Sequence, residues 1–522
     1  MGKIKTGLLF CLSLFLFMPG NGHCQNSTQN ISNSDQWVAT DSLGRTLPTY
    51  AECGGYKPNK YVGVFYWFWH GFVRTSPIKD MTKELHNTNG NPTFAYQDWY
   101  WGEPEDGYYH SSDPYVLRKN ITMLANAGVD FVFIDFTNGG IDWSIIDPFC
   151  TTALALKQQG IQVPRIVFFL NTGAKAVMSQ LYNDYYSQNK YKDLWFYWDG
   201  KPLIMESADS AATQTIKDFF TFRDTWAFQS DQHDQWRFID DYPQRYSWHT
   251  DANTPEQICV SRSMGAPLYT IGSVNNKGSS YTKAKGTPQY DQYMECPRTP
   301  YGDFFEEQWS QAHTLNPSIV LVSGWNELTA GAWHGLNGSH MFMKSPVPPA
   351  PNDWYMVDEF NVEFNRDIEP VKGYCTDNYY YQMISHIRKY KGMQAPDTAS
   401  SPKTIAIDGS FGDWSSVTPV FIDPVGDVPQ RNWRNVDNSA NYVNTTGRND
   451  MVESRVTYDN TYVYYYVKTV QTITAYTDPN WMLLFIDVDK NKATGWEGYD
   501  YVINNGVNSA LQTTVKHWDG TS

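Results

Sequence analysis

The feature that most constrains the fold is an alternation of apolar, strand-like runs with amphipathic stretches between residues 60 and 391. The clearest unit begins with a predicted helix over 113–128, where Asp113 serves as N-cap and Pro114 takes the first helical position. It leads directly into the apolar run 129–140, VDFVFIDFTNGG. Alternating buried strands and helices are typical of a parallel sheet covered on both faces. About eight strands in roughly 330 residues favour a (β/α)8 TIM-type barrel over a doubly wound sheet.

The other strands and helices of this α/β region are predicted from the same pattern. Helices are expected near 147–159, 175–188, 303–314 and 376–392. Strands are expected within 61–71, 164–173, 202–209, 225–229, 237–242, 258–263 and 318–327, of which the middle ones are the least regular.

The C-terminal part of the chain has a different pattern. Residues 393–404 are a linker by composition. From 405 to 522 the chain has short β runs, several with period two, and no helix signal. This pattern predicts a separate all-β sandwich domain after a first domain over 59–392.

The N-terminus predicts export. Two lysines precede an apolar stretch that is too short to span a bilayer and typical of a signal peptide, so 1–24 is expected to be removed and 25–58 to form a flexible leader. No other apolar run has membrane-spanning length. We expect a secreted, periplasmic or cell-surface protein, with a lipid anchor at Cys24 as an alternative. One or two disulfides are compatible with that compartment, and the sequence does not pair them.

Charge and aromatic content indicate the partner. The net charge is −15 and no long basic run occurs, which argues against nucleic acid. Aromatic residues make up 16% of the chain, with 20 Trp and 36 Tyr. Many can be core residues, but such rings also stack on the apolar faces of sugars. A carbohydrate substrate is therefore expected.

In a (β/α) barrel, functional side chains project from the carboxyl ends of the strands. Asp135 and Glu327 follow two of the clearest strands and are the predicted catalytic carboxylates, because glycosidic bond cleavage needs one group to protonate the leaving oxygen and one to act as nucleophile or base. For each, the alternative is an ordinary loop acid. Other polar residues at strand ends are predicted to bind substrate, namely His70, Asn138, Asn171, Glu206, Asp240, Asp241 and Asn326.

Aromatic residues near these strand ends are predicted to line the sugar subsites. The first strand ends in FYWFWHG, and a long aromatic and acidic loop spans 97–113. Loops of this length inside a barrel are usually functional, although a packed lid is the alternative. The residues expected to contact sugar are Tyr66, Trp67, Trp69, Trp101, Glu103 and Trp325.

Other chemistries lack their motifs. The sequence has no GxGxxG, no Walker lysine motif, no HExxH and no GxSxG, and no cofactor is expected for the reaction. In the C-terminal module, Asp487, Asp489 and Asn491 alternate as in a calcium loop, so a structural calcium ion is one interpretation and a polar hairpin turn is the other.

With these residues assigned, the first domain resembles the glycoside hydrolase 71/99-like superfamily of the endo-α-mannosidase type. The similar segments are VGVFYWFWHG, GYYHSSDPYVLRKNITMLANAGVDFVFIDFTNG, SGWNELTAG and NVEFNRDIEP with TDNYYYQMISHIRKYKG. The tail resembles a family 9-type carbohydrate-binding or DOMON-like sandwich, in which Trp414 or Trp496 would stack on sugar. The resemblance implies a glycoside hydrolase with a glycan-binding module.

One position departs from the family pattern. The endomannosidase motif has two catalytic glutamates three residues apart; Glu327 matches the first, and Ala330 occupies the second. Either another strand supplies the partner, with Asp135 preferred, or the mechanism differs, or the barrel only binds glycan. A non-catalytic surface glycan-binding protein is therefore the rival hypothesis, and a glycan-processing transferase is a third.

Overall fold

The structure is a computed structural model that describes most of the chain. The predicted signal peptide and Cys24 lie outside the described residues. Among the helices that are described, none has the length and apolar character needed to cross a bilayer. The described residues are 32–72, 77–264, 277–334, 354–356, 358–478, 480–491, 493–509 and 512–520.

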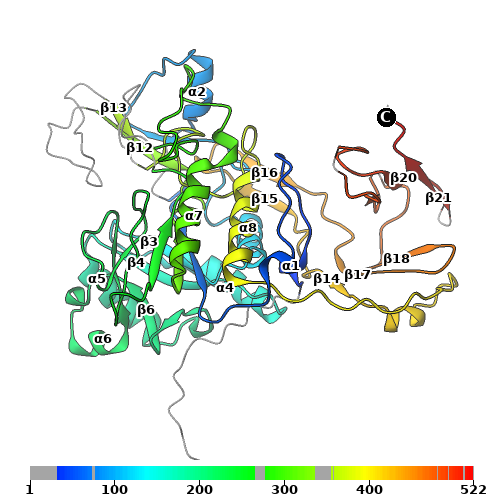
Figure 1. Ribbon diagram of the computed structural model, residues 1–522, viewed down its shortest axis with the longest axis horizontal. Coiled ribbons are helices and arrows are strands. Elements are labelled where there is room, and N and C mark those ends of the chain that lie inside the picture. Colours follow the sequence, from blue (N-terminus) through cyan, green and yellow to red (C-terminus); the bar gives the residue numbers. More distant parts are fainter. Residues whose placement is uncertain are drawn as a thin grey trace, which may run out of the picture.

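The predicted parallel sheet is present at the centre of the first region (Figure 1). It has eight strands in the order β10-β11-β1-β3-β4-β6-β5, with β7 also paired to β6, and only β5 runs antiparallel. The strands are β1 (Tyr61–Tyr66), β3 (Phe131–Phe136), β4 (Arg165–Leu170), β5 (Tyr197–Trp198), β6 (Lys201–Met205), β7 (Thr221–Phe222), β10 (Gln257–Val260) and β11 (Ile319–Val322).

Helices follow most of these strands, as the alternation predicts. In α3 (Pro114–Asn126), the Asp113 side chain accepts a hydrogen bond from Tyr115 N at 3.0 Å and caps the helix. The other α-helices are α1 (Tyr50–Cys53), α2 (Met81–Asn87), α4 (Trp143–Gln158), α5 (Ala174–Leu181), α6 (Gln214–Phe219), α7 (Asp303–Leu315) and α8 (Asn378–Lys391).

The sheet is curled around a core of its own. One apolar cluster lies between the sheet and helices such as α3, α4 and α8. A second cluster is made of the alternate side chains of the strands and includes Phe65, Phe133, Phe169 and Leu321. Because successive residues of a strand face opposite sides, these two clusters occupy the outer and inner faces of the curled sheet.

Backbone pairing does not show a complete barrel. Two further strands, β8 (Asp224–Trp226) and β9 (Gln235–Arg237), form a separate parallel pair beside the gap between β7 and β10. The side chain of Gln257 in β10 accepts from Arg237 N at 3.1 Å and donates to Arg237 O at 2.7 Å. The amide of Gln257 thus replaces a backbone pair between β9 and β10.

A small antiparallel sheet lies next to the carboxyl ends of the central strands. It pairs β12 (Thr329–His334) with both β2 (Asp98–Tyr100) and β13 (Trp354–Met356). Strand β12 starts two residues after Glu327, so this sheet constrains the candidate catalytic loop.

The C-terminal region contains small antiparallel sheets and one 3-10 turn, η7 (Gly412–Ser416), within the described residues. Its buried apolar cluster is limited to Ile405, Trp414 and Val417. The described strands therefore support an all-β region, while a two-sheet sandwich with one shared core remains a prediction. The strands are β14 (Phe421–Ile422), β15 (Arg431–Arg434), β16 (Asn441–Asn444), β17 (Met451–Tyr458), β18 (Val463–Thr469), β19 (Leu484–Ile486), β20 (Tyr501–Ser509) and β21 (Gln512–His517).

One hairpin of this region packs on the first region. Strands β15 and β16 lie beside α8 in Figure 1, away from β17 and β18. Arg431 of β15 pairs with the buried Asp113 at 2.7 Å, and the hydroxyl of Tyr442 accepts from Tyr108 N at 2.9 Å. Gly107, at φ 79°, leaves no room for a Cβ atom, which would lie 2.4 Å from the Tyr442 ring. The hairpin is therefore fitted to the loop that precedes α3.

The described cysteines form no disulfide. All five are buried with free thiols, so the one or two bridges compatible with an exported protein are not found among them. They are Cys53, Cys150, Cys259, Cys296 and Cys375.

Candidate active site

The candidate site lies at the carboxyl ends of the central strands, where β3 presents Asp135 and the segment after β11 presents Glu327. Asp135 is 5% exposed, and burial raises the pKa of its carboxyl, while hydrogen bonds from Thr137 and Trp67 oppose that shift. The indole of Trp69 donates to the Asp135 carbonyl oxygen at 3.2 Å. Trp67 and Trp69, in the segment that follows the adjacent strand β1, thus hold Asp135.

The electrostatic surroundings of Glu327 strongly favour its neutral form. Burial raises its pKa well above the usual value, and the negative charge of Asp358 raises it further. The Arg366 guanidinium, whose Nη2 lies 3.0 Å from the Glu327 carboxylate, opposes that shift. The charge of Asp135 also contributes to the raised pKa of Glu327, so these two carboxyl groups lie within electrostatic reach of each other.

A dense group of acids surrounds Arg366, and three of its members were missed by the sequence reasoning. Asp358 lies 2.8 Å from Arg366 Nη1, and its charge raises the pKa of both Glu327 and Asp135. Glu359 is fully buried and accepts from Arg366 N at 3.2 Å. In the sequence this segment was marked by the density of acids in DEFNVEFNRDIE and by the family resemblance of NVEFNRDIEP, but it follows no predicted strand.

Asp367, the third of these acids, fixes the loop that carries Glu327. Its carboxylate accepts from Glu327 N at 2.8 Å and from Leu328 N at 2.6 Å. Leu328 has a positive φ of 59°, which is uncommon for a bulky residue. Trp101, fully buried, donates its indole N–H to the same carboxylate at 2.8 Å. Trp101 therefore supports the loop that carries Glu327, and a side chain without exposed surface cannot make the sugar contact predicted for it.

Asn326 and His70 join the ends of β1 and β11. The Asn326 side-chain amide accepts from Trp67 N at 2.9 Å and donates to Trp67 O at 3.1 Å. It thus makes the two hydrogen bonds that a neighbouring strand would make, at a point where β1 and β11 have ended. His70 Nε2 lies 2.8 Å from the Asn326 carbonyl oxygen and donates to it. Both side chains are at most 1% exposed. They position the site, and the substrate contact predicted for them is not available to these buried groups.

Tyr66 and Trp325 point away from the site. Both belong to the outer cluster between the sheet and the helices, where Tyr66 contacts Phe149 and Trp325 contacts Tyr380. The prediction that they line the subsites is therefore wrong. For Tyr66 the reason is strand parity, because the side chain between inward-facing Phe65 and Trp67 must face outward, whereas Trp325 turns outward in the loop after β11.

Three predicted acids are engaged in ion pairs. Glu103 is held between Lys83 at 2.5 Å and Lys372 at 2.6 Å. Asp240 is buried, with Arg237 at 3.4 Å and Arg245 at 3.5 Å, and Asp241 pairs with Lys277. Asn138 and Asn171 are exposed just beyond β3 and β4, and the half-buried Glu206 follows β6. These last three stay at the same edge as Asp135, so their substrate contacts remain predictions.

Ala330 is outside the carboxylate group. It pairs with Trp99 between β12 and β2 and is 4% exposed within the apolar cluster of that small sheet. A glutamate side chain there would enter an apolar core, which is costly for a charged group. Ala330 therefore supplies nothing to the carboxylate group, whereas the charges of Asp135 and Asp358 both act on Glu327.

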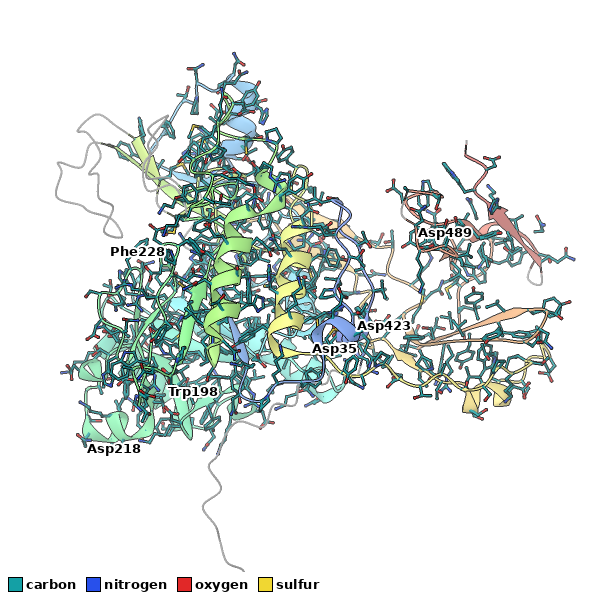
Figure 2. The ribbon with its side chains drawn as sticks, viewed as in Figure 1. Asp35, Trp198, Asp218, Phe228, Asp423 and Asp489 are labelled. Carbon is teal, nitrogen blue, oxygen red and sulfur yellow. The ribbon has the colours of Figure 1, made fainter. Side chains whose placement is uncertain are left out.

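The C-terminal predictions have a mixed outcome. Trp414 is 5% exposed in its own core, so it does not stack on sugar, whereas Trp496 is 51% exposed and packs against Phe485 at 5.1 Å. Oxygen atoms of Asp487, Asp489 and Asp500 lie within 4.8 Å of one another. Asp489 is labelled in Figure 2. Calcium binding there stays a prediction.

No protein-family model matches the chain, and no curated protein matches it. Among solved structures, the chain is similar to the GH99 endo-alpha-mannosidase from Bacteroides thetaiotaomicron in complex with BIS-TRIS-propane, with 13% identity and a TM-score of 0.34 over 63% of this chain and 97% of that one. Another structure of that enzyme gives 14% and 0.32 over the same shares. A glycoside hydrolase-like protein gives 14% and 0.37 over 65% and 95%. Likenesses of this size establish neither a shared fold nor an activity.

Proposed function

We propose that the protein is an exported glycoside hydrolase that cleaves a poly- or oligosaccharide by carboxylate acid/base catalysis. The observation that carries the proposal is the state of Glu327, a buried carboxyl at the carboxyl edge of the sheet whose pKa is raised well above its usual value. A general acid must hold its proton at the working pH, and burial beside other acids is how proteins achieve this.

In the proposed reaction, Glu327 gives its proton to the leaving glycosidic oxygen, and Asp135 acts as nucleophile or base. The negative charge left on Glu327 is met by Arg366 at 3.0 Å. The carboxylate separation decides the stereochemistry, with about 5 Å for retention and more than about 6.5 Å for inversion. Exposed Asn138, Asn171 and the half-buried Glu206 would hold the sugar.

Asp358 is the second candidate for the partner carboxylate. Its side chain is 15% exposed and held by Arg366, whereas Asp135 is more buried and one of its oxygens accepts from Thr137 N at 2.9 Å. A more accessible carboxylate is better placed to reach an anomeric carbon or a water molecule. The rival function, glycan binding without cleavage, would need neither partner.

We also propose that β9, together with β8 as the continuation of β7 one residue further on, completes a (β/α)8 barrel. The bridge formed by Gln257 and the presence of Trp236 and Phe238 in the inner cluster support this arrangement. For the C-terminal region we propose glycan binding at Trp496, and for the N-terminus cleavage of the signal peptide, with lipidation at Cys24 as the alternative.

A glycan screen tests the function. The full mature chain is incubated with plant, yeast and host glycans, and released sugars are measured. Glu327→Gln should lower turnover by about three orders of magnitude, because general acid catalysis contributes about 10²–10⁴-fold, while glycan binding persists. The matched control is Asp209→Asn, whose side chain is 94% exposed. A fully active Glu327→Gln protein would remove the assignment, and binding without release by the wild type would support the rival.

A second comparison identifies the partner. Asp135→Asn and Asp358→Asn are assayed on a substrate found in the screen, with and without added azide. The variant that lacks the nucleophile of a retaining enzyme should lose turnover and recover part of it with azide. A variant that stays within about twofold of wild type is not the partner.

A further inference from the structure

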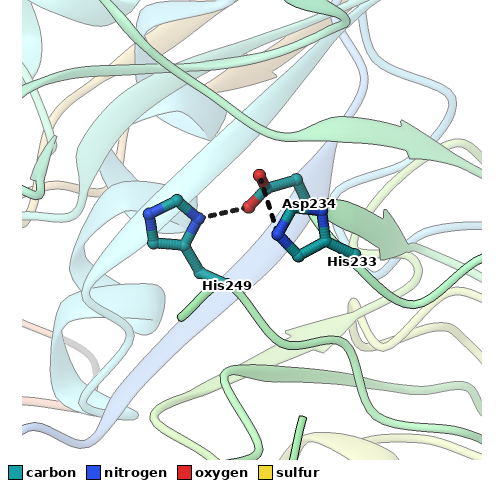
Figure 3. Close-up of side chains that lie close together, drawn as sticks. All are labelled: His233, Asp234 and His249. Carbon is teal, nitrogen blue, oxygen red and sulfur yellow. Dashed lines mark hydrogen bonds and ion pairs between the residues drawn. The ribbon is translucent and has the colours of Figure 1, made fainter. Parts of the chain in front are cut away.

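We infer that His233, Asp234 and His249 form a binding site for one Zn²⁺ ion, separate from the candidate active site. Figure 3 shows the three side chains gathered around the Asp234 carboxylate. His249 Nδ1 lies 2.5 Å from Asp234 Oδ1, and His233 Nε2 lies 3.7 Å from Asp234 Oδ2. One ligand atom from each residue lies within 4.8 Å of the others.

The backbone brings these residues together from two segments. Trp248 N donates to Gln232 O at 2.9 Å, and Asp234 N donates to Trp248 O at 2.9 Å. This short ladder places the residue after Trp248, His249, next to Asp234. The His233 ring is further held against the Trp248 indole, with the centroids 4.4 Å apart. The two ligand segments are therefore fixed relative to each other before any ion binds.

The distances suit a small ion after a modest adjustment. Two ligand atoms of a tetrahedral zinc ion, each about 2.0–2.1 Å from the metal, are about 3.4 Å apart. The 3.7 Å separation of His233 and Asp234 is already close to this value. The 2.5 Å contact of His249 is that of a hydrogen bond, in which the ring proton occupies the position that the metal would take. The side chains are 36–50% exposed, so they can open by about 1 Å at little cost.

The donor set selects the metal. Two imidazole nitrogens with one carboxylate oxygen suit zinc and its first-row neighbours, while calcium and magnesium prefer oxygen ligands alone. Arg223 Nε also lies 3.7 Å from Asp234, but this arginine makes its shorter contacts of 2.6–2.8 Å with Glu256 and Asp199. The Asp234 carboxylate therefore stays available to a cation.

The position of the cluster argues for a structural role. His233 and Asp234 directly precede β9, at the amino end of the strand, whereas Asp135 and Glu327 lie at or beyond the carboxyl ends of β3 and β11. An ion here would tie the β8–β9 connection to the 247–249 segment. It would thus strengthen the part of the curled sheet where Gln257, rather than a backbone pair, makes the link.

Zinc titration of the full chain tests the site. After EDTA treatment and removal of the chelator, ZnCl2 is titrated by calorimetry, and CoCl2 is titrated by visible absorption, which reports nitrogen and oxygen coordination. We expect saturable binding with a melting temperature that rises with zinc concentration. His249→Ala and His233→Ala should weaken binding by at least about tenfold and abolish the cobalt absorption bands. Magnesium should not compete.

Two controls separate this site from other features. His86→Ala removes a histidine of similar exposure, 47%, that also pairs with an acid, Glu295 at 3.2 Å, and it should bind zinc as the wild type does. Asp489→Asn should leave zinc binding unchanged, because it alters the acidic cluster of the C-terminal region. His249→Gln serves if His249→Ala does not fold. Absence of saturable zinc binding, or equal zinc affinity in the wild type and both histidine variants, would overturn the assignment.

Discussion

Replacing Arg366 with methionine tests whether the candidate site is held together by one buried cation. Arg366 is 2% exposed and pairs with Glu327 at 3.0 Å and Asp358 at 2.8 Å, while its backbone N–H donates to Glu359. Methionine keeps much of the side-chain volume and removes the charge. The substitution therefore leaves several buried acids without their common partner.

The expected cost follows from these distances. At an effective dielectric constant of about 20, the Asp358 pair at roughly 3 Å contributes about 5–6 kcal/mol of Coulomb attraction, and the Glu327 pair contributes as much only where Glu327 is ionised. The cost of burying the arginine, and protonation of an acid once it is gone, offset much of this sum. Breaking a buried pair by removing one partner costs about 3–5 kcal/mol, which is the loss in unfolding free energy we expect near pH 7.5.

The loss should depend on pH with a definite sign. The folded pKa of Glu327 is already raised above its unfolded value, so the stabilisation from its protonation is present below the unfolded pKa and is lost as the pH rises through the folded pKa. Without Arg366 the folded pKa rises further, and this window extends to higher pH. The difference between variant and wild type should therefore shrink on acidification, by about 1.4 kcal/mol per pH unit for each additional proton bound.

Equilibrium urea unfolding at several pH values between 5.5 and 7.5 measures this. Arg298→Met is the matched control, because its pair with Asp303 involves a side chain that is 48% exposed and should cost about 1 kcal/mol or less. An Arg366→Met protein that loses less than about 1 kcal/mol at pH 7.5, or whose deficit grows on acidification, would refute the reasoning.

Three further substitutions test other parts of the structure by urea or thermal unfolding. Gly63→Ala should lower the free energy of unfolding by about 1–3 kcal/mol, because a Cβ atom would lie 2.3 Å from the Phe131 ring. Gly412→Ala, with open space at that position, should be nearly neutral, and equal effects of the two substitutions would contradict the packing of the inner cluster. Asn326→Leu should cost about 2–4 kcal/mol, since it leaves Trp67 N and O unpaired, and a loss below about 1 kcal/mol would show that this link is dispensable. Arg431→Ala should lower the free energy of unfolding by about 3–5 kcal/mol, because it leaves Asp113 buried without its partner. Replacing the exposed Arg434 with alanine should have little effect, and similar losses for the two variants would show that the contact between the hairpin and Asp113 does not stabilise the protein.

Local signals predicted the first region well where a helix and strand are adjacent in sequence. The cap at Asp113 and the apolar run after it correspond to α3 and β3. The middle of the barrel was harder, because β7 and β8 are only two and three residues long and a glutamine side chain replaces one strand pair. The periodicity of apolar residues in a sequence does not show that a side chain takes the place of a backbone strand pair.

The site was predicted in part for similar reasons. Strand ends identified Asp135 and Glu327, which the structure brings within electrostatic reach of each other. Asp358 and Asp367 could not be found from strand ends, because they lie in an irregular segment about 30–40 residues after Glu327. No predicted strand precedes that segment. The outward-facing Tyr66 was a predictable error, since strand parity assigns it to the face opposite Phe65, whereas Trp325 lies beyond the end of β11, where parity with Leu321 would have placed it inward.

The β15–β16 hairpin also bears on how such a chain could be recombined in evolution. A boundary at 393–404 would suggest that the two parts can be inherited separately. The pairing of Arg431 with Asp113, and the fit of Tyr442 against Gly107, place β15 and β16 within the first part's own packing, whereas η7 and β14, which precede them, pack on β17 and β18. A cut at 393–404 would remove the hairpin from the first part, and a cut after Asn444 would separate β14 from β17, so the two parts are best inherited as one unit.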